Sequence, residues 1–194
     1  YTTNKEGKGV AWANSLFEDN AEFGMGMNVA VETLRHRIED VMLRTKDTAP
    51  NALAALYSDW IAYKNDGEKT TQIAKILTPL LEQNLSVEGV KEILELKRYL
   101  VKKSQWIIGG DGWAYDIGFG GLDHVLASGE NVNVLVLDTE VYSNTGGQSS
   151  KSSRAGSIAQ FTASGKPMQK KDLGYIAMTY GNIFVAQINS NASQ

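Results

Sequence analysis

The 194-residue sequence contains no cysteine, only two histidines and three prolines, and no long apolar run. Without cysteine, the chain cannot form a disulfide, use a thiol nucleophile or hold an iron–sulfur cluster through thiolates. This composition fits a reducing compartment, so we expect the cytoplasm. No apolar run is long enough to span a bilayer and no signal peptide is recognisable, so we expect no membrane contact.

The net charge and the length further limit the kinds of protein that this chain can be. The formal net charge of −3 at pH 7 argues against nucleic acid as a partner. Hydrophobic residues make up 42% of the chain, enough for a core, and the length suits one α/β domain or one with an appendage. His36 and His124 lie in presumed helices without metal-site spacing, so we expect neither to bind a metal. Because the sequence starts at Tyr1 rather than Met, we expect a piece of a longer protein.

Apolar residues recur at steps of three and four in four segments between residues 21 and 103, which predicts helices that form a core. The first helix is expected to start near Met27. Pro50 suits the first turn of the second helix, and Pro79 predicts a kink or an early end in the third. Ser86 is the predicted cap of the fourth.

After residue 104 the pattern changes to strand, helix, strand. We predict strands at Gln105–Gly109 and Val132–Leu137 and a helix at Trp113–Ser128 between them, stopped by Gly129. This is a βαβ unit with parallel strands. The predicted fold is therefore α/β, a parallel sheet flanked by helices.

We expect residues 1–194 to form a single, partial domain. Its parts are an irregular stretch at 1–20, a helical segment at 21–103 and a βαβ core at 104–194.

Residues 139–171 are predicted to form one long loop, with a short helix near Gly156–Phe161. A helix at Asp172–Tyr180 and a third strand at Ile183–Ile188 should follow. The Ser- and Gly-rich stretch 143–157 is also compatible with a flexible linker. However, the loop leaves the carboxyl edge of the sheet, where ligands of α/β proteins bind, so we interpret it as functional.

A Gly110-Asp111-Gly112 turn follows the first predicted strand. Backbone N–H groups and a helix dipole at such a turn favour a phosphate. The Asp111 carboxylate would repel that phosphate unless a divalent cation lay between the two anions. Mg²⁺ favours oxygen ligands and substrate phosphates, so the turn predicts a metal-bridged diphosphate site.

The Gly110-Asp111-Gly112 turn and the loop after the second strand are spaced as in a known family signature. Gly-Asp-Gly, then a polar pair after a second strand, resembles the signature of thiamine-diphosphate enzymes; most have Asn-Asn where this chain has Asp138-Thr139. With that departure, the stretches Ser15–Gly24, Gly109–Gly118 and Asp138–Gln148 resemble pyruvate:ferredoxin (flavodoxin) oxidoreductases. The resemblance runs essentially end to end and covers most of the C-terminal cofactor domain of that long enzyme.

The resemblance implies thiamine diphosphate and Mg²⁺ as cofactors. It implies that Asp111, Thr139 and the backbone carbonyl of Val141 bind the metal, and that Asn144 acts in catalysis at the reacting end of the cofactor. The implied cofactor-binding residues are Gly110, Asp111, Gly112, Trp113, Thr139, Glu140, Val141, Tyr142, Ser143 and Asn144.

The resemblance also implies an activity. Members oxidise pyruvate to acetyl-CoA and CO₂ and pass electrons through [4Fe–4S] clusters to ferredoxin or flavodoxin. The cluster cysteines and the acid that activates the aminopyrimidine ring would belong to remaining domains of the same enzyme, expected as a homodimer. The isolated chain would then be inactive.

Two alternatives remain. Gly110-x-Gly112-x-x-Tyr115 resembles a dinucleotide-binding fingerprint, with Asp138 near the place of the ribose-binding acid, although Tyr115 replaces the third glycine. A non-catalytic assembly module is the other alternative.

The stretch Val141–Lys171 contains no acidic residue. Its cations form either a solvated loop face or a patch that steers an acidic redox partner or coenzyme A. These cations are Lys151, Arg154, Lys166, Lys170 and Lys171.

Overall fold

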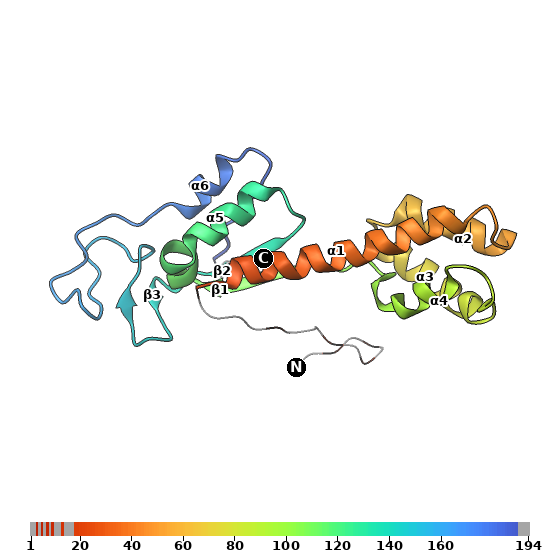
Figure 1. Ribbon diagram of the computed structural model, residues 1–194. Coiled ribbons are helices and arrows are strands. Elements are labelled where there is room, and N and C mark those ends of the chain that lie inside the picture. Colours follow the sequence, from red (N-terminus) through yellow and green to blue (C-terminus); the bar gives the residue numbers. More distant parts are fainter. Residues whose placement is uncertain are drawn as a thin grey trace. The chain divides into compact units, whose positions relative to one another are not determined.

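The computed structural model describes residues 18–189 and, ahead of them, Thr3, Lys5, Gly7, Gly9 and Ala13. The predicted irregular stretch at 1–20 and the Ser15–Phe17 part of the family motif lie largely outside these residues. The chain divides into two compact units (Figure 1). One is Gly26–Gln105; the other combines Trp106 onward with the residues up to Met25.

Helix α1, Asn20–Thr45, is longer than predicted. The expected start near Met27 is wrong because the first two turns pack on the first strand. Ala21 is fully buried there, and a Cβ on Gly24 would lie 2.4 Å from Cγ1 of Ile107. Glycine therefore lets this end of α1 lie against Ile107, and that packing offsets glycine's poor helix propensity.

The helical unit adds α2 (Asn51–Tyr63), α3 (Gly67–Glu82), α4 (Val90–Glu95) and a short 3₁₀ helix at Lys97–Tyr99. Most of the predicted apolar stripe residues form its core, although Met27 and Ile76 are 44% and 62% exposed. The fully buried core residues include Ile38, Leu53, Tyr57, Trp60, Leu77, Leu81, Ile93 and Leu100.

Of the two outcomes predicted for Pro79, the early end does not occur, since α3 continues to Glu82; a kink at this residue stays a prediction. The predicted cap of α4 is wrong: the helix begins at Val90 after Gly89, a residue with φ of 79°, and not after Ser86. A Cβ on Gly89 would lie 2.6 Å from Cγ1 of Val41, so close packing against α1 fixes this start.

The other unit contains the predicted βαβ element. Strands β1 (Trp106–Gly110) and β2 (Asn133–Leu137) are parallel, and Gly110 pairs with Leu137. The connecting helix is divided into a π-helical turn, Gly112–Ile117, and α5, Phe119–Ser128. Gly129 ends α5 with a φ of 71°, as predicted. The α/β prediction is confirmed.

The region after β2 differs most from prediction. The long loop contains a hairpin, β3 (Val141–Tyr142) and β4 (Gln148–Ser149), and residues 156–161 form turns and isolated bridges rather than a helix. Helix α6 is present at Leu173–Met178.

The predicted third strand at Ile183–Ile188 is wrong. No described strand pairs with this segment, and Phe184 and Ile188 are 92% and 85% exposed. Its alternating apolar pattern therefore lacks the ladder partner that a strand needs.

Candidate functional site

The two predicted loops meet at the carboxyl edge of the sheet. Because Gly110 pairs with Leu137, Asp111 and Asp138 leave neighbouring strands at the same level. The Asp111 side chain is buried, and the backbone N–H of Thr139 donates to its Oδ1 at 3.2 Å. The sequence prediction that these loops face each other is confirmed.

Three oxygens lie close together: the hydroxyl oxygen of Thr139, one carboxylate oxygen of Asp111 and the carbonyl oxygen of Val141. Oγ1 of Thr139 lies 2.9 Å from Oδ1 of Asp111 and 3.1 Å from the carbonyl oxygen of Val141. Neighbouring ligand oxygens in an Mg²⁺ octahedron are about 3.0 Å apart, given Mg–O distances of about 2.1 Å. One carboxylate, one hydroxyl and one carbonyl therefore fit a hard cation that keeps other positions for phosphate and water.

No group of three or more histidine or acidic residues suited to a metal occurs among the described residues. The three oxygens around Thr139 are thus a weakly charged set. Such a set suits a cation that also binds the negative charge of a diphosphate, as Mg²⁺ does with substrate phosphates.

The glycine turn is tightly packed on one side and open on the other. A Cβ on Gly112 would lie 2.5 Å from Cδ1 of Tyr142, and one on Gly109 would lie 2.4 Å from Cε3 of Trp113. At Gly110 the nearest atom would be 4.0 Å away. Gly110 is half-buried and leaves more room beside its backbone than Gly109 or Gly112, whereas the Trp113 ring is buried beneath the turn.

The remaining predicted residues occupy the hairpin. Oγ of Ser143 lies 3.0 Å from Oγ1 of Thr139, so it borders the three oxygens. Asn144 is exposed in the turn after β3. Burial, followed by the charges of Asp116 and Asp111, raises the pKa of Tyr142 to about 12, so its hydroxyl stays neutral.

The carboxylate of Glu140 contacts two cations of the long loop rather than the oxygens of Asp111, Thr139 and Val141. The φ of Glu140 is 64°, and its carboxylate pairs with Arg154 at 3.1 Å and Lys170 at 3.3 Å. Its side chain stabilises the loop, and a direct cofactor contact of this residue stays a prediction.

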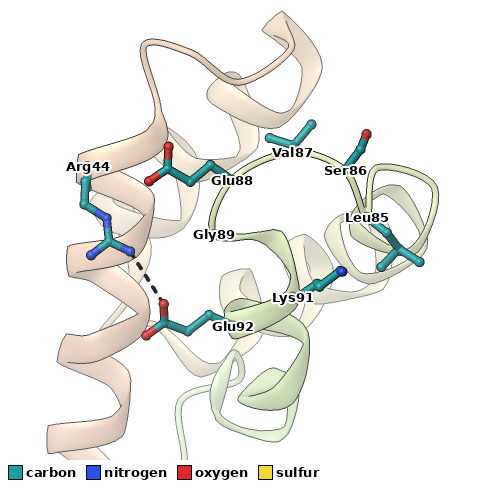
Figure 2. Close-up of a pocket in the computed structure, with 8 residues that line it drawn as sticks. All are labelled: Arg44, Leu85, Ser86, Val87, Glu88, Gly89, Lys91 and Glu92. Carbon is teal, nitrogen blue, oxygen red and sulfur yellow. Dashed lines mark ion pairs between the residues drawn. The ribbon is translucent and has the colours of Figure 1, made fainter.

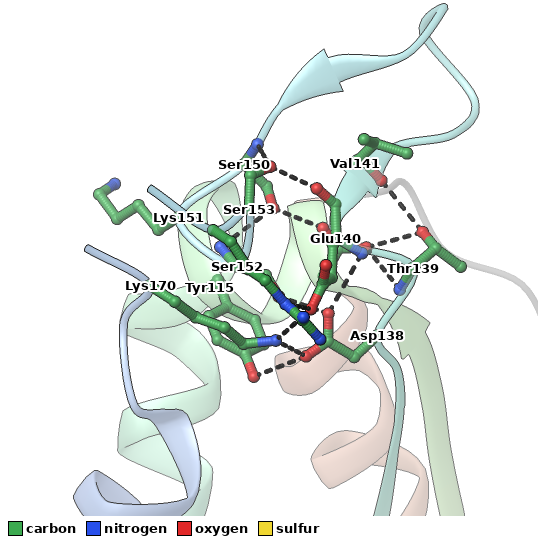
Figure 3. A network of polar contacts seen from close by, with 12 residues as sticks. Tyr115, Asp138, Thr139, Glu140, Val141, Ser150, Lys151, Ser152, Ser153 and Lys170 are labelled. Carbon is green, nitrogen blue, oxygen red and sulfur yellow. Dashed lines mark hydrogen bonds and ion pairs between the residues drawn. The ribbon is translucent and has the colours of Figure 1, made fainter. Parts of the chain in front are cut away.

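Sequence reasoning missed a polar network behind the site. Figure 3 shows Tyr115 and Lys170 pointing toward the carboxylate of Asp138, which accepts their hydrogen bonds at 3.0 and 2.7 Å. Ser152 donates to its other oxygen. Burial alone would raise the pKa of Asp138, but these three hydrogen bonds outweigh it and hold that pKa below its usual value.

This network also weakens the dinucleotide alternative. Both carboxylate oxygens of Asp138 are engaged within the chain, so the position expected for a ribose-binding acid is already occupied by protein donors. No sequence signal distinguishes an Asp that binds ribose from one that binds a loop lysine.

The cations of the loop all contact groups of the chain itself, although the side chains of Lys151 and Arg154 are also largely exposed to solvent. Nζ of Lys151 lies 2.7 Å from Asp116, and Lys171 donates to the carbonyl of Tyr115 at 3.1 Å. Arg154 and Lys170 make the ion pairs described above, and the ammonium of Lys166 is buried. These contacts favour a structural role over electrostatic steering.

A shallow pocket in the helical unit is a weaker candidate. Figure 2 shows Arg44 paired with Glu92 at 3.5 Å beside the 85–89 segment. None of the predicted site residues lines it, and two of its charged residues, Arg44 and Glu92, already pair with each other. No helix in the described part of the chain is long and apolar enough to cross a membrane.

Comparison with known proteins identifies the family. Residues 90–194, more than half of the chain, match the family described as thiamine pyrophosphate enzyme, C-terminal TPP binding domain. The chain belongs to this family. The match contains both loops of the site and confirms the resemblance drawn from the sequence.

Named relatives agree with the narrower resemblance. The chain is 52% identical over 200 residues to a pyruvate-flavodoxin oxidoreductase of Klebsiella pneumoniae and to a pyruvate:ferredoxin oxidoreductase of Moorella thermoacetica, covering 100% of this chain and 17% of each relative. It is 52% identical over 192 residues to a mitochondrial pyruvate dehydrogenase [NADP(+)] of Euglena gracilis, covering 97% of this chain and 11% of that protein. The chain thus spans about a sixth or less of the length of these relatives.

Proposed function

We propose that this chain binds the diphosphate of thiamine diphosphate through an Mg²⁺ ion held by Asp111, Thr139 and the carbonyl of Val141. The observation that carries the proposal is the convergence of their three oxygens at the edge where β1 and β2 end. Membership of the thiamine pyrophosphate family supports the cofactor. The hard, oxygen-only donor set supports the metal.

The proposed metal ligands differ in charge. Asp111 contributes the negative charge that attracts the cation, and Thr139 and Val141 contribute neutral oxygens without further repulsion of the diphosphate. The room beside the backbone at Gly110 allows close approach of the phosphate, while Gly112 admits the Tyr142 ring that covers the turn. Glu140, Ser143 and Trp113 are proposed to shape this cofactor pocket from the hairpin and from beneath.

Asn144 is the proposed catalytic residue of the chain. Its side chain is exposed in the hairpin turn, where an amide can donate to a carbonyl or accept from a bound group. When bound, thiamine diphosphate supplies the nucleophilic carbon and the electron sink for decarboxylation of a 2-oxo acid. The amide of Asn144 would stabilise the charge that develops beside it.

We further propose that the full-length enzyme oxidises pyruvate with coenzyme A in the cytoplasm. The names of the relatives support pyruvate as the substrate, and two of them contain flavodoxin or ferredoxin, which supports one of these as the acceptor. The [4Fe–4S] clusters and the homodimeric state are carried over from the family resemblance. Because this chain has no cysteine, other domains would hold the clusters.

Calorimetry tests the binding proposal directly. Thiamine diphosphate titrated into the full-length protein that carries this chain should bind in the presence of Mg²⁺ and not after chelation by EDTA. Thiamine without phosphate is the matched control and should bind at least tenfold more weakly, since it lacks the group that the metal bridges. Equal affinity with and without metal would contradict the proposal.

A further inference from the structure

Three buried serines form a turn directly behind the metal ligands. Ser150, Ser152 and Ser153, here called the serine turn, are 4%, 0% and 1% exposed. Buried hydroxyls are costly unless they are hydrogen-bonded. Each of these hydroxyls reaches a different part of the proposed site, and Figure 3 shows Ser152 and Ser153 beside Asp138 and Glu140.

The hydroxyl contacts join the ends of both strands. Ser150 donates to Oδ2 of Asp111, at the end of β1, and Ser152 donates to Oδ1 of Asp138, at the end of β2. Ser153 donates to the carbonyl of Glu140, between the two metal ligands of the second loop. The serine turn therefore contacts both loops that supply metal ligands.

The direction of the Ser150 hydrogen bond is fixed by its neighbours. The backbone N–H of Ser152 donates to Oγ of Ser150 at 3.0 Å, so this oxygen already accepts one hydrogen bond. The carboxylate of Asp111 can only accept, so the Ser150 proton must point at Asp111. Its Oδ2 is thereby engaged, and Oδ1 remains on the side of Thr139.

A buried cation holds the serine turn in place. The ammonium of Lys166 donates to the backbone carbonyls of Lys151 and Ser153, and the N–H of Lys171 donates to the carbonyl of Lys151 at 2.8 Å. Lys166 is 5% exposed. These bonds connect the serine turn to the end of the long loop and restrict its movement away from Asp111.

We propose that Ser150 is a positioning residue for the metal site: its hydroxyl orients the Asp111 carboxylate so that one oxygen faces the cation. The inference rests on the proposed function. A carboxylate rotates easily about its last bond, and a hydrogen bond to the far oxygen selects one orientation. Partners of metal ligands commonly change metal affinity by about 10- to 100-fold when removed.

The test compares Ser150→Ala with Ser157→Ala in the full-length protein. Ser157 is the matched control because it lies in the same loop and its hydroxyl donates only to the local carbonyl of Arg154. Mn²⁺ is the probe, since it shares the octahedral oxygen preference of Mg²⁺ and its free form is measured by electron paramagnetic resonance. Each titration contains saturating thiamine diphosphate, and each melting temperature is measured without metal.

Ser150→Ala should weaken Mn²⁺ binding by about 10-fold or more. It should still unfold cooperatively without metal, at a somewhat lower melting temperature than the wild type, because the N–H of Ser152 and Oδ2 of Asp111 lose this hydroxyl as a partner. Ser157→Ala should leave the Mn²⁺ affinity unchanged. Ser150→Cys, which has the shape of serine but is slightly larger and donates weakly, should fall between the two and serves if the alanine variant does not fold.

Unchanged Mn²⁺ affinity in the Ser150 variants, or an equal loss in Ser157→Ala, would overturn the positioning role. A wild-type protein that binds no Mn²⁺ with thiamine diphosphate would instead overturn the proposed function, and the inference with it. The wild-type titration separates these two failures.

Discussion

The hydroxyl oxygen of Thr139 lies 2.9 Å from Oδ1 of Asp111, although 28 residues separate them in the sequence. The relationship follows from the sheet: Gly110 pairs with Leu137, so the residues that follow β1 and β2 emerge together. A shift of one residue in this register would turn the side chains to opposite faces. The register of two short strands thus determines whether the proposed metal site exists.

Replacing Asp111 with alanine should abolish metal-dependent cofactor binding in the full-length protein. The loss of affinity should exceed the roughly 100-fold that follows when a residue hydrogen-bonded to a metal ligand is removed. The reason is the missing charge between diphosphate and cation. Thr139→Val should lose about tenfold, since a neutral oxygen is removed. Calorimetric titration of thiamine diphosphate with Mg²⁺ measures both, and wild-type affinity in Asp111→Ala would refute the assignment.

The glycine turn provides a matched pair of substitutions. Gly112→Ala should lower the metal-free melting temperature because its Cβ would lie 2.5 Å from the Tyr142 ring. At Gly110 an added Cβ would make only an ordinary contact, 4.0 Å from the carbonyl oxygen of Leu137. Gly110→Ala should therefore leave that temperature unchanged, yet weaken diphosphate binding about tenfold where the phosphate approaches the backbone. If Gly110→Ala binds as tightly as the wild type, the phosphate does not lie against this turn.

Asn144→Ala should lower kcat by about 100-fold while leaving cofactor affinity nearly unchanged. An amide that contacts the reacting group mainly in the transition state affects turnover rather than binding. Steady-state kinetics of the full-length enzyme, paired with a cofactor titration, separate these effects. A variant that merely binds the cofactor poorly would show that Asn144 supports the pocket.

Tyr57→Phe should stabilise the helical unit by about 1 kcal/mol at pH 7. The Tyr57 hydroxyl is buried and has no hydrogen-bond partner within the described part of the chain, so its removal relieves a desolvation cost. Urea unfolding of the wild type and the variant measures the difference. Equal stability, or a less stable variant, would indicate a partner for this hydroxyl.

The same substitution should change the alkaline behaviour. Burial raises the pKa of Tyr57 above its ordinary value near 10. The folded state then keeps a proton that the unfolded state releases, so this contribution to stability is present below about pH 10 and lost as the pH rises further. The advantage of Tyr57→Phe should therefore grow above pH 10, and a constant difference between the two proteins would contradict this account.

The isolated 194-residue chain should be catalytically silent. It contains no cysteine to hold a cluster, so electrons have no route to an acceptor. The folded chain, checked by circular dichroism, is mixed with pyruvate, coenzyme A, thiamine diphosphate, Mg²⁺ and a viologen dye. Steady dye reduction above a protein-free control would place a whole active site in this chain.

Sequence reasoning was most successful where one local rule decides the outcome. The pairing of the Asp111 turn with the Thr139 loop followed from two apolar strands and the rule that parallel carboxyl ends share an edge. The stop at Gly129 followed from the left-handed conformation that glycine adopts. These features depend on neighbours in the sequence or on one well-known topology.

The serine turn shows what sequence could not supply. Stretch 143–157 has the composition of a flexible linker, yet Ser150 and Ser152 are buried by hydrogen bonds to carboxylates 39 and 14 residues away. The start of α1 could not be predicted for a related reason. Gly24 is compatible with this helix because Ile107 packs closely against it. Such positions depend on contacts distant in the chain, which periodicity and propensity do not encode.

A structure of the full-length protein with thiamine diphosphate and Mn²⁺ tests the central claim most directly. The account predicts one anomalous peak about 2.2 Å from Oδ1 of Asp111, Oγ1 of Thr139 and the carbonyl oxygen of Val141, with diphosphate oxygens completing the shell. A diphosphate bound without a metal at these three atoms, or a metal bound elsewhere on the chain, would contradict it.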